Sequence, residues 1–147
     1  MATHGLPSHL LNSMLTPWPD TGALPAAEGM LLDAMRGWNQ ARTPLPAAAL
    51  ILAAAGAEAL AIPLDALLRL VRPELRCPLC PRSSADESAL LAVVALAQHE
   101  QRSCALAVLL RVAAPLPAYN AMGAVLTLAG GMRAMGLALA NPFSRPG

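Results

Sequence analysis

The sequence predicts an all-α protein, a compact single-domain bundle of five to seven helices. Hydrophobic residues make up 56% of the 147 residues while aromatic residues make up only 3%, because alanine and leucine dominate, and both are good helix formers. No run of residues alternates with the period of two typical of strands. The 14 prolines fall mostly between the apolar segments, where they end helices. The helical domain is predicted at 26–142, after an irregular proline-rich arm at 1–25 and before a short tail at 143–147.

Three helices are expected in the first half of the domain, at 26–42, 46–61 and 63–72, each bounded by prolines. In the first of them the apolar residues recur at helical spacing. The polar residues of that helix, among them Asp33 and Arg36, are predicted on its exposed face, where these two would pair across three positions.

The second half begins with a capping-box sequence, in which Ser84 precedes Glu87 by three positions. This motif predicts a helix over 85–98. The polar stretch 98–103 then either lies on one long helix or turns the chain into a hairpin with a helix at 102–113, and we favour the hairpin.

The last helix is expected at 117–140 and contains Gly123, Gly130, Gly131 and Gly136. Glycine is costly inside a helix, so these residues predict that another helix approaches closely. The stretch 98–103 also holds His99 beside Glu100, for which we expect a solvated position because no nucleophile adjoins them.

A proline-rich corner at 74–83 joins the predicted helical halves 26–73 and 84–141 and contains Cys77 and Cys80. Two cysteines at this spacing form one half of many zinc sites, and His99 with Cys104 would supply the other half if the chain turns at 98–103. A redox pair is a second interpretation. The third, which we favour, is that the cysteines are small apolar side chains in a stiff corner. The expected cofactor is accordingly none, or one zinc ion.

Charge and composition limit the class of protein. The net charge is only +1, and the arginines are spread along the chain rather than clustered, so nucleic-acid binding is not expected. No apolar run reaches the length of a membrane span free of prolines and charges. The absence of lysine favours a bacterial origin with a GC-rich genome. An odd number of cysteines and no visible signal peptide favour a reducing cytoplasm.

With few charges and much apolar surface, the chain is expected to bind a partner. We predict a non-enzymatic adaptor, regulator or accessory subunit that self-associates as a homodimer or binds a partner protein, with no catalytic residues. The alternatives are a zinc-binding structural or metal- or redox-sensing protein, and a peripheral membrane or apolar-ligand binder. The predicted interface residues are Trp18, Trp38, Met122, Met132 and Met135.

Overall fold

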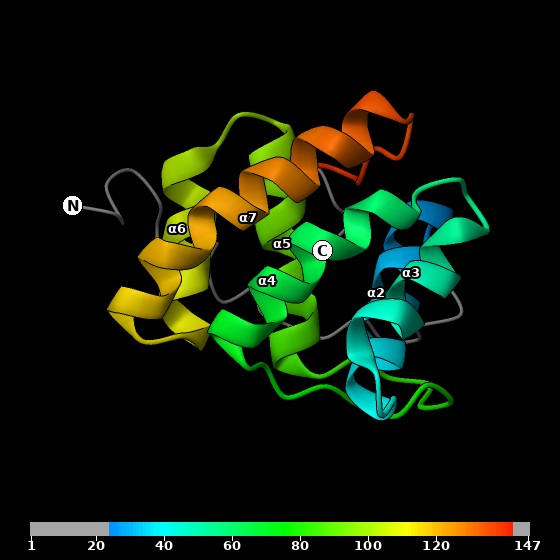
Figure 1. The fold of residues 1–147 in the computed structure, drawn as a ribbon. Helices are drawn as coiled ribbons and strands as arrows, with labels where there is room; N and C mark the ends of the chain where they lie inside the picture. Colours follow the sequence, from blue (N-terminus) through cyan, green and yellow to red (C-terminus); the bar gives the residue numbers. More distant parts are fainter. Residues whose placement is uncertain (1–23, 143–147) are drawn as a thin grey trace.

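The computed structural model describes residues 24–142, and its regular structure in that range is entirely helical, which confirms the predicted all-α class. Residues 1–23 of the predicted arm and the tail 143–147 lie outside the described residues. The helices of the described range are α2 (Ala26–Gln40), α3 (Pro44–Ala53), the 3-10 helix η2 (Glu58–Leu60), α4 (Ala61–Val71), α5 (Ala85–Gln98), α6 (Arg102–Val112) and α7 (Pro115–Ala134) (Figure 1).

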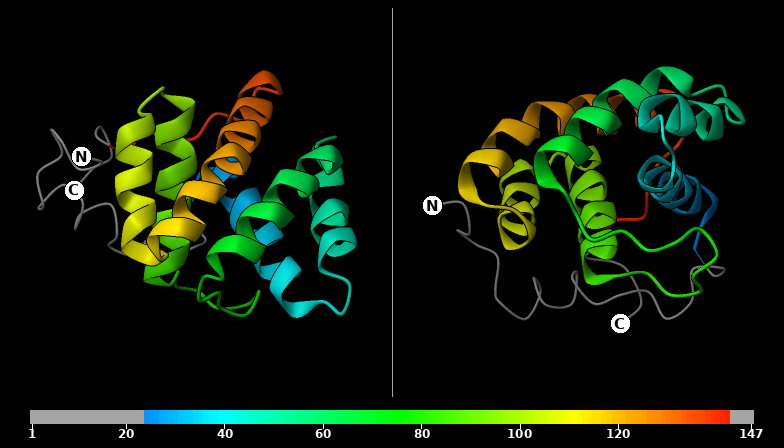
Figure 2. Two further views of the ribbon diagram at one scale, coloured as in Figure 1. Left: turned by 60° about the vertical axis from the view of Figure 1, so that its left-hand side comes forward. Right: turned by 60° about the horizontal axis from the view of Figure 1, so that its bottom comes forward.

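The helices form two groups that meet along α4 and α7. In one group α2 packs against α3, and α3 against α4; in the other, α5 packs against both α6 and α7. Figure 2 shows α5 and α6 side by side, with α7 crossing them and α4 running next to α7. The two groups also touch through a direct contact between α5 and α2.

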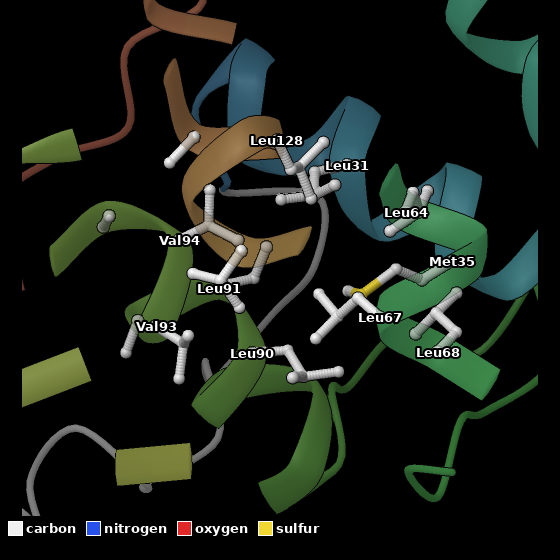
Figure 3. Packing of buried hydrophobic residues seen from close by; sticks show 14 of the residues in the cluster. Leu31, Met35, Leu64, Leu67, Leu68, Leu90, Leu91, Val93, Val94 and Leu128 are labelled. Atoms are coloured by element: carbon white, nitrogen blue, oxygen red, sulfur yellow. The ribbon is translucent and has the colours of Figure 1, made fainter. Parts of the chain in front are cut away.

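The central element is α5, in which every residue from Glu87 to Leu96 is buried. A helix that is apolar on all faces must be covered on all faces, and α2, α6 and α7 together provide that cover. In Figure 3 Leu90, Leu91 and Val94 of α5 lie on the side that faces α2, α4 and α7, whereas Val93 points away from them. The labelled residues from those three helices are Leu31, Met35, Leu64, Leu67, Leu68 and Leu128.

The predicted helix at 46–61 is wrong as one element, because the chain turns after Ala53. Gly56 adopts a positive φ of 70°, a conformation that glycine takes without steric cost and that commonly ends a helix. The chain then forms η2 and enters α4 at Ala61, two residues earlier than predicted. Pro63 therefore lies in the first turn of α4, where its missing N–H has no partner to lose.

The predicted hairpin of two helices around 98–103 is confirmed. Glu100 has a φ of 60°. The amide of Gln101 donates to the carbonyl of Leu96 at 2.8 Å, and that of Glu100 to the carbonyl of Ala97 at 3.2 Å. This pair of bonds is the Schellman motif that ends many helices, here with a glutamate where glycine is usual.

A second Schellman motif ends α7 at Ala134, so the predicted extension to residue 140 is wrong. Gly136 has a φ of 77°, and the amide of Leu137 donates to the carbonyl of Met132 at 2.8 Å. Of the glycines that were expected to admit a neighbouring helix, only Gly131 does so: a Cβ added there would lie 2.5 Å from Cδ2 of Leu60. Gly123 and Gly130 face open space.

After α7 the chain folds back over the bundle and is held by two buried side chains. The amide of Leu139 donates to Oε1 of Gln98 at 2.7 Å. The amide of Ala140 donates to Oε2 of Glu28 at 3.1 Å. The polar stretch 98–103 is therefore not uniformly solvated, since Gln98 is buried while His99 and Glu100 are exposed.

Between residues 24 and 142, none of the helices combines the length and the hydropathy that a membrane-crossing segment requires.

Candidate functional site

The one buried basic side chain in the described part of the chain belongs to Arg36 in α2, which is 1% exposed. Its predicted place on the exposed face, paired with Asp33, is wrong. The Nε and Nη2 atoms of Arg36 donate instead to Oε2 and Oε1 of Glu87, each at 2.9 Å. Such a two-pronged contact satisfies both oxygens of the carboxylate and fixes the orientation of the guanidinium group.

Glu87, which is 0% exposed, is also the third residue of α5 and completes the predicted capping box. The Ser84 side chain accepts from the Glu87 amide at 3.1 Å, and the Ser84 amide donates to Oε1 of Glu87 at 2.8 Å. The amide of Arg76 donates to Oε2 at 2.9 Å. Burial alone would raise the pKa of Glu87, but the hydrogen bonds from Arg36 and the two amides together hold it below its usual range.

The corner at 74–83 leaves the end of α4, passes beneath α2 and returns to the start of α5, as the lower right of Figure 1 shows. Arg36 reaches into it from α2: Nη1 donates to the carbonyl of Cys80 at 2.9 Å, and Nη2 to that of Arg82 at 3.0 Å. At its base, the Ser84 hydroxyl donates to the carbonyl of Glu74 at 2.7 Å. Buried side chains thus fix the loop backbone at several points, and at the surface Asp86 adds a contact by accepting from the Glu74 amide at 2.7 Å.

At the tip of the corner, residues 77–80 form a tight turn in which the amide of Cys80 donates to the carbonyl of Cys77 at 3.1 Å. Pro78 occupies the second position of the turn, which its fixed φ favours. Leu79 follows and is 93% exposed, the most exposed of the large hydrophobic side chains in the described residues. Cys77 is exposed and Cys80 is partly buried.

The two thiols differ in their surroundings. The backbone amide of Arg82 donates to the Cys80 sulfur, and Nη1 of Arg76 lies 3.9 Å from Sγ of Cys80. The amide and the guanidinium group stabilise the thiolate and hold the pKa of Cys80 below its usual range, although burial acts in the opposite direction. The turn therefore presents one exposed thiol and one thiol with an arginine beside it.

The structure does not bring together the four residues predicted to bind zinc. Cys77 and Cys80 precede α5, while His99 and Cys104 follow its far end, and a helix of 14 residues separates the pairs by about 21 Å. The His99 ring instead contacts the carbonyl of Leu139 at 3.2 Å. Within residues 24–142, no group of three or more His, Cys, Asp and Glu side chains could hold a metal ion. The sequence did not show whether the two pairs of ligands meet. The length of α5 keeps them apart.

The predicted interface residues occupy different environments. Trp38 is partly buried, donates from Nε1 to Oδ1 of Asp65 at 2.8 Å, and has the guanidinium carbon of Arg69 5.9 Å from its ring centre. Met132 is buried in the core, Met122 is partly buried, and Met135 is exposed just beyond α7; Trp18 lies outside the described residues.

A groove of about 470 Å³ lies where the α5–α6 hairpin meets α7. Its lining includes the oppositely charged residues Glu100 and Arg102 from the hairpin and Arg133 from α7. Arg133 is already engaged, since its Nη1 donates to the carbonyl of Gln98 at 2.8 Å. No nucleophile or acid–base pair lines this groove, so the corner at 74–83 is the better candidate for a functional site.

Comparison with known proteins adds no family to this description: no protein-family model matches the chain, and no curated protein or solved structure gave a significant match. The class that the fold and the site define is an all-helical protein with a protruding, internally fixed Cys-Pro-Leu-Cys turn.

Proposed function

We propose that this protein is a non-enzymatic helical protein that acts through protein–protein contacts, and that the corner at 74–83 is its contact surface. The observation that carries the proposal is the exposure of Leu79, at 93%, on a turn whose backbone is held by a buried arginine. An exposed leucine alone is ordinary on protein surfaces. A leucine at the tip of a loop that buried side chains hold in place is suited to contact a partner protein.

The physical reason is the entropy of association. Ordering a mobile loop on binding costs free energy, and a loop held in place beforehand avoids that cost. Here the carbonyls of Cys80 and Arg82 both accept from Arg36, and the amide of Arg76 donates to Glu87. The turn between these anchors presents Leu79 in one position. Arg76 and Arg82 flank the turn in sequence, and arginine is enriched among the residues that dominate binding energy at interfaces.

A metal- or redox-active role is the second candidate function, and the Cys77–Cys80 turn is the specific observation that favours it. Both thiols lie on one hydrogen-bonded turn, and Arg76 lies beside Cys80. A reducing cytoplasm suits either role, because both need free thiols. The peripheral membrane or apolar-ligand alternative has no comparable observation in its favour.

Photo-crosslinking in living cells tests the proposal. A photoreactive amino acid replaces Leu79 in one variant and Leu50, which is 77% exposed on α3, in a matched control. We expect a discrete crosslinked product from position 79 that position 50 does not give. We also expect Leu79→Ser to abolish binding of the partner protein at the corner without changing the thermal midpoint of unfolding. Identical products from both positions would overturn the proposal.

A further inference from the structure

We propose that Cys77 and Cys80 form half of a tetrahedral zinc site, and that the same two residues of a second copy of this chain complete it. This inference rests on the proposed function, since it names the partner of the same corner. In this arrangement the zinc ion is bound by cysteines from both chains of a symmetric dimer, rather than by residues of a single chain.

The turn has the residue spacing that a pair of zinc ligands needs. Two cysteines separated by two residues on a tight turn supply adjacent corners of a tetrahedron, with zinc–sulfur distances of about 2.3 Å. The hydrogen bond from the Cys80 amide to the Cys77 carbonyl, at 3.1 Å, sets that turn before any metal binds. Cys77 is exposed and Cys80 is only partly buried, so an ion and a second chain can reach both sulfurs.

One chain supplies only two ligands at this place in the described structure. Structural zinc sites are closed by four protein ligands, and within residues 24–142 no third His, Cys, Asp or Glu joins the pair. The remaining thiol, that of Cys104, lies beyond the far end of α5. A second copy related by a two-fold axis would add an identical pair, with the zinc ion on the axis. Two-fold dimers are the commonest symmetric assembly, and they use the same patch on both chains.

The residues around the sulfurs suit this arrangement. Four thiolates around one Zn²⁺ leave a net charge of −2, and the four thiol protons pass to solvent. Arg76 lies 3.9 Å from the Cys80 sulfur, so the two chains together place two guanidinium groups near that charge, and the Arg82 amide donates to the same sulfur in each chain. An N–H group directed at a ligand sulfur is a usual supporting contact in metal sites. Leu79, between the two ligands, would be covered by the partner copy.

The fold does not need the metal, which distinguishes this site from that of a zinc finger. Arg36 and Glu87 hold the corner through protein contacts alone. An interface formed by two turn tips has a small area, and small interfaces give only weak association. Zinc binding would supply the additional free energy that the dimer needs. Zinc would therefore control dimerisation while leaving the helical fold unchanged.

Metal analysis and light scattering on the full-length protein under reducing conditions test the inference. We expect one zinc ion for every two chains and the mass of a dimer. A strong chelator should return the protein to the mass of one chain with its helical circular dichroism unchanged, and added zinc should restore the dimer.

Variants separate this site from other donors. Cys77→Ser and Cys80→Ser should each lose both the zinc and the dimer. Cys104→Ser should keep both, as should the double variant His4→Ala, His9→Ala, which removes the histidines that precede the described residues. Cobalt bound in place of zinc should show the sulfur-to-metal charge-transfer absorption of a tetrathiolate site.

Three results would overturn the inference: no zinc bound, one zinc ion per monomeric chain, or a dimer that is indifferent to chelator and to both cysteine substitutions. An internal Cys77–Cys80 disulfide that forms in air and persists in the functional protein would also count against it. The proposed function can survive each of these results, because crosslinking from position 79 to a different protein would still identify the corner as a contact surface.

Discussion

Arg36 and Glu87 form a buried ion pair, 2.9 Å apart, across 51 residues of sequence. The pair links α2, the corner at 74–83 and the first turn of α5, because each side chain also hydrogen-bonds to the backbone of the corner. A buried ion pair contributes little net stability over a well-packed apolar pair, but removing one partner leaves an uncompensated buried charge. Its effect is therefore clearest in single substitutions.

Arg36→Ala is expected to lower the free energy of unfolding by about 3–5 kcal/mol, the range for breaking a buried pair. Urea unfolding followed by circular dichroism measures the change. The matched control is Arg69→Ala, which removes the exposed pair with Asp65 at 3.0 Å and should cost less than about 1 kcal/mol. Equal losses of unfolding free energy in the two variants would show that the buried pair matters no more for stability than the exposed one.

Stability should fall in acid through Glu87. Its pKa in the folded protein is held below its usual range, so the unfolded chain binds the proton more readily. The stabilisation is then complete above the pKa of an unfolded glutamate, about 4.3, and is lost as the pH falls through the folded value.

The pH dependence is measured as the midpoint of urea unfolding between neutral pH and strong acid. Glu87→Gln should flatten the curve in the acid range. The pKa of Asp65 is also lowered: burial would raise it, but hydrogen bonds from Trp38 and Arg69 outweigh that effect. Asp65→Asn is therefore the comparison. If it flattens the curve more than Glu87→Gln does, the buried pair is not the main acid-sensitive contact.

Gly131→Ala and Gly123→Ala should differ although both lie in α7. Alanine at Gly123 meets nothing within 4 Å and should gain about 1 kcal/mol from helix propensity. Alanine at Gly131 would place its Cβ 2.5 Å from Cδ2 of Leu60, so the end of that side chain must move, and the repacking should offset the gain from helix propensity. Thermal unfolding of the two variants checks the order, and a Gly131→Ala protein at least as stable as Gly123→Ala would contradict the close approach.

Glu100→Gly is expected to stabilise the protein by up to about 1 kcal/mol. The φ of 60° at this position costs a side-chain-bearing residue about 1–2 kcal/mol, and glycine returns part of that gain through its larger entropy loss on folding. Glu100→Ala is the control, because it removes the carboxylate but keeps the unfavourable backbone conformation. A gain in Glu100→Ala as large as that in Glu100→Gly would assign the effect to charge.

Local patterns in the sequence were enough to predict the helical class, the start of α5 and the α5–α6 hairpin. The capping box at Ser84 and Glu87 contains both partners within four residues, so its geometry follows from sequence spacing. The early ends of α3 and α7 were also open to prediction. Gly56 follows an apolar run and Gly136 comes three residues after Arg133, and glycine at such places is a recognised stop signal.

The burial of Arg36 was not predictable in this way. Its position beside the apolar stripe was visible, but its partner lies in a different helix, and an arginine in a helix is usually solvent-exposed. Gln98 presents the same difficulty, since the amide that it accepts from belongs to Leu139, 41 residues away. For the cysteines, the sequence does not give the distance between the Cys77–Cys80 pair and the His99–Cys104 pair. The structure gives it, because the 14 residues of α5 lie between the two pairs.

The hydrogen bond between the Ala140 amide and Glu28 joins positions 112 residues apart. Bringing such distant segments together has an entropic cost that grows with the length of the enclosed chain, whereas the α5–α6 hairpin needs only local contacts. We therefore expect the hairpin to form early on the folding pathway and the Glu28 contact to form late. The bundle can therefore close only after the ribosome has released the chain as far as Ala140.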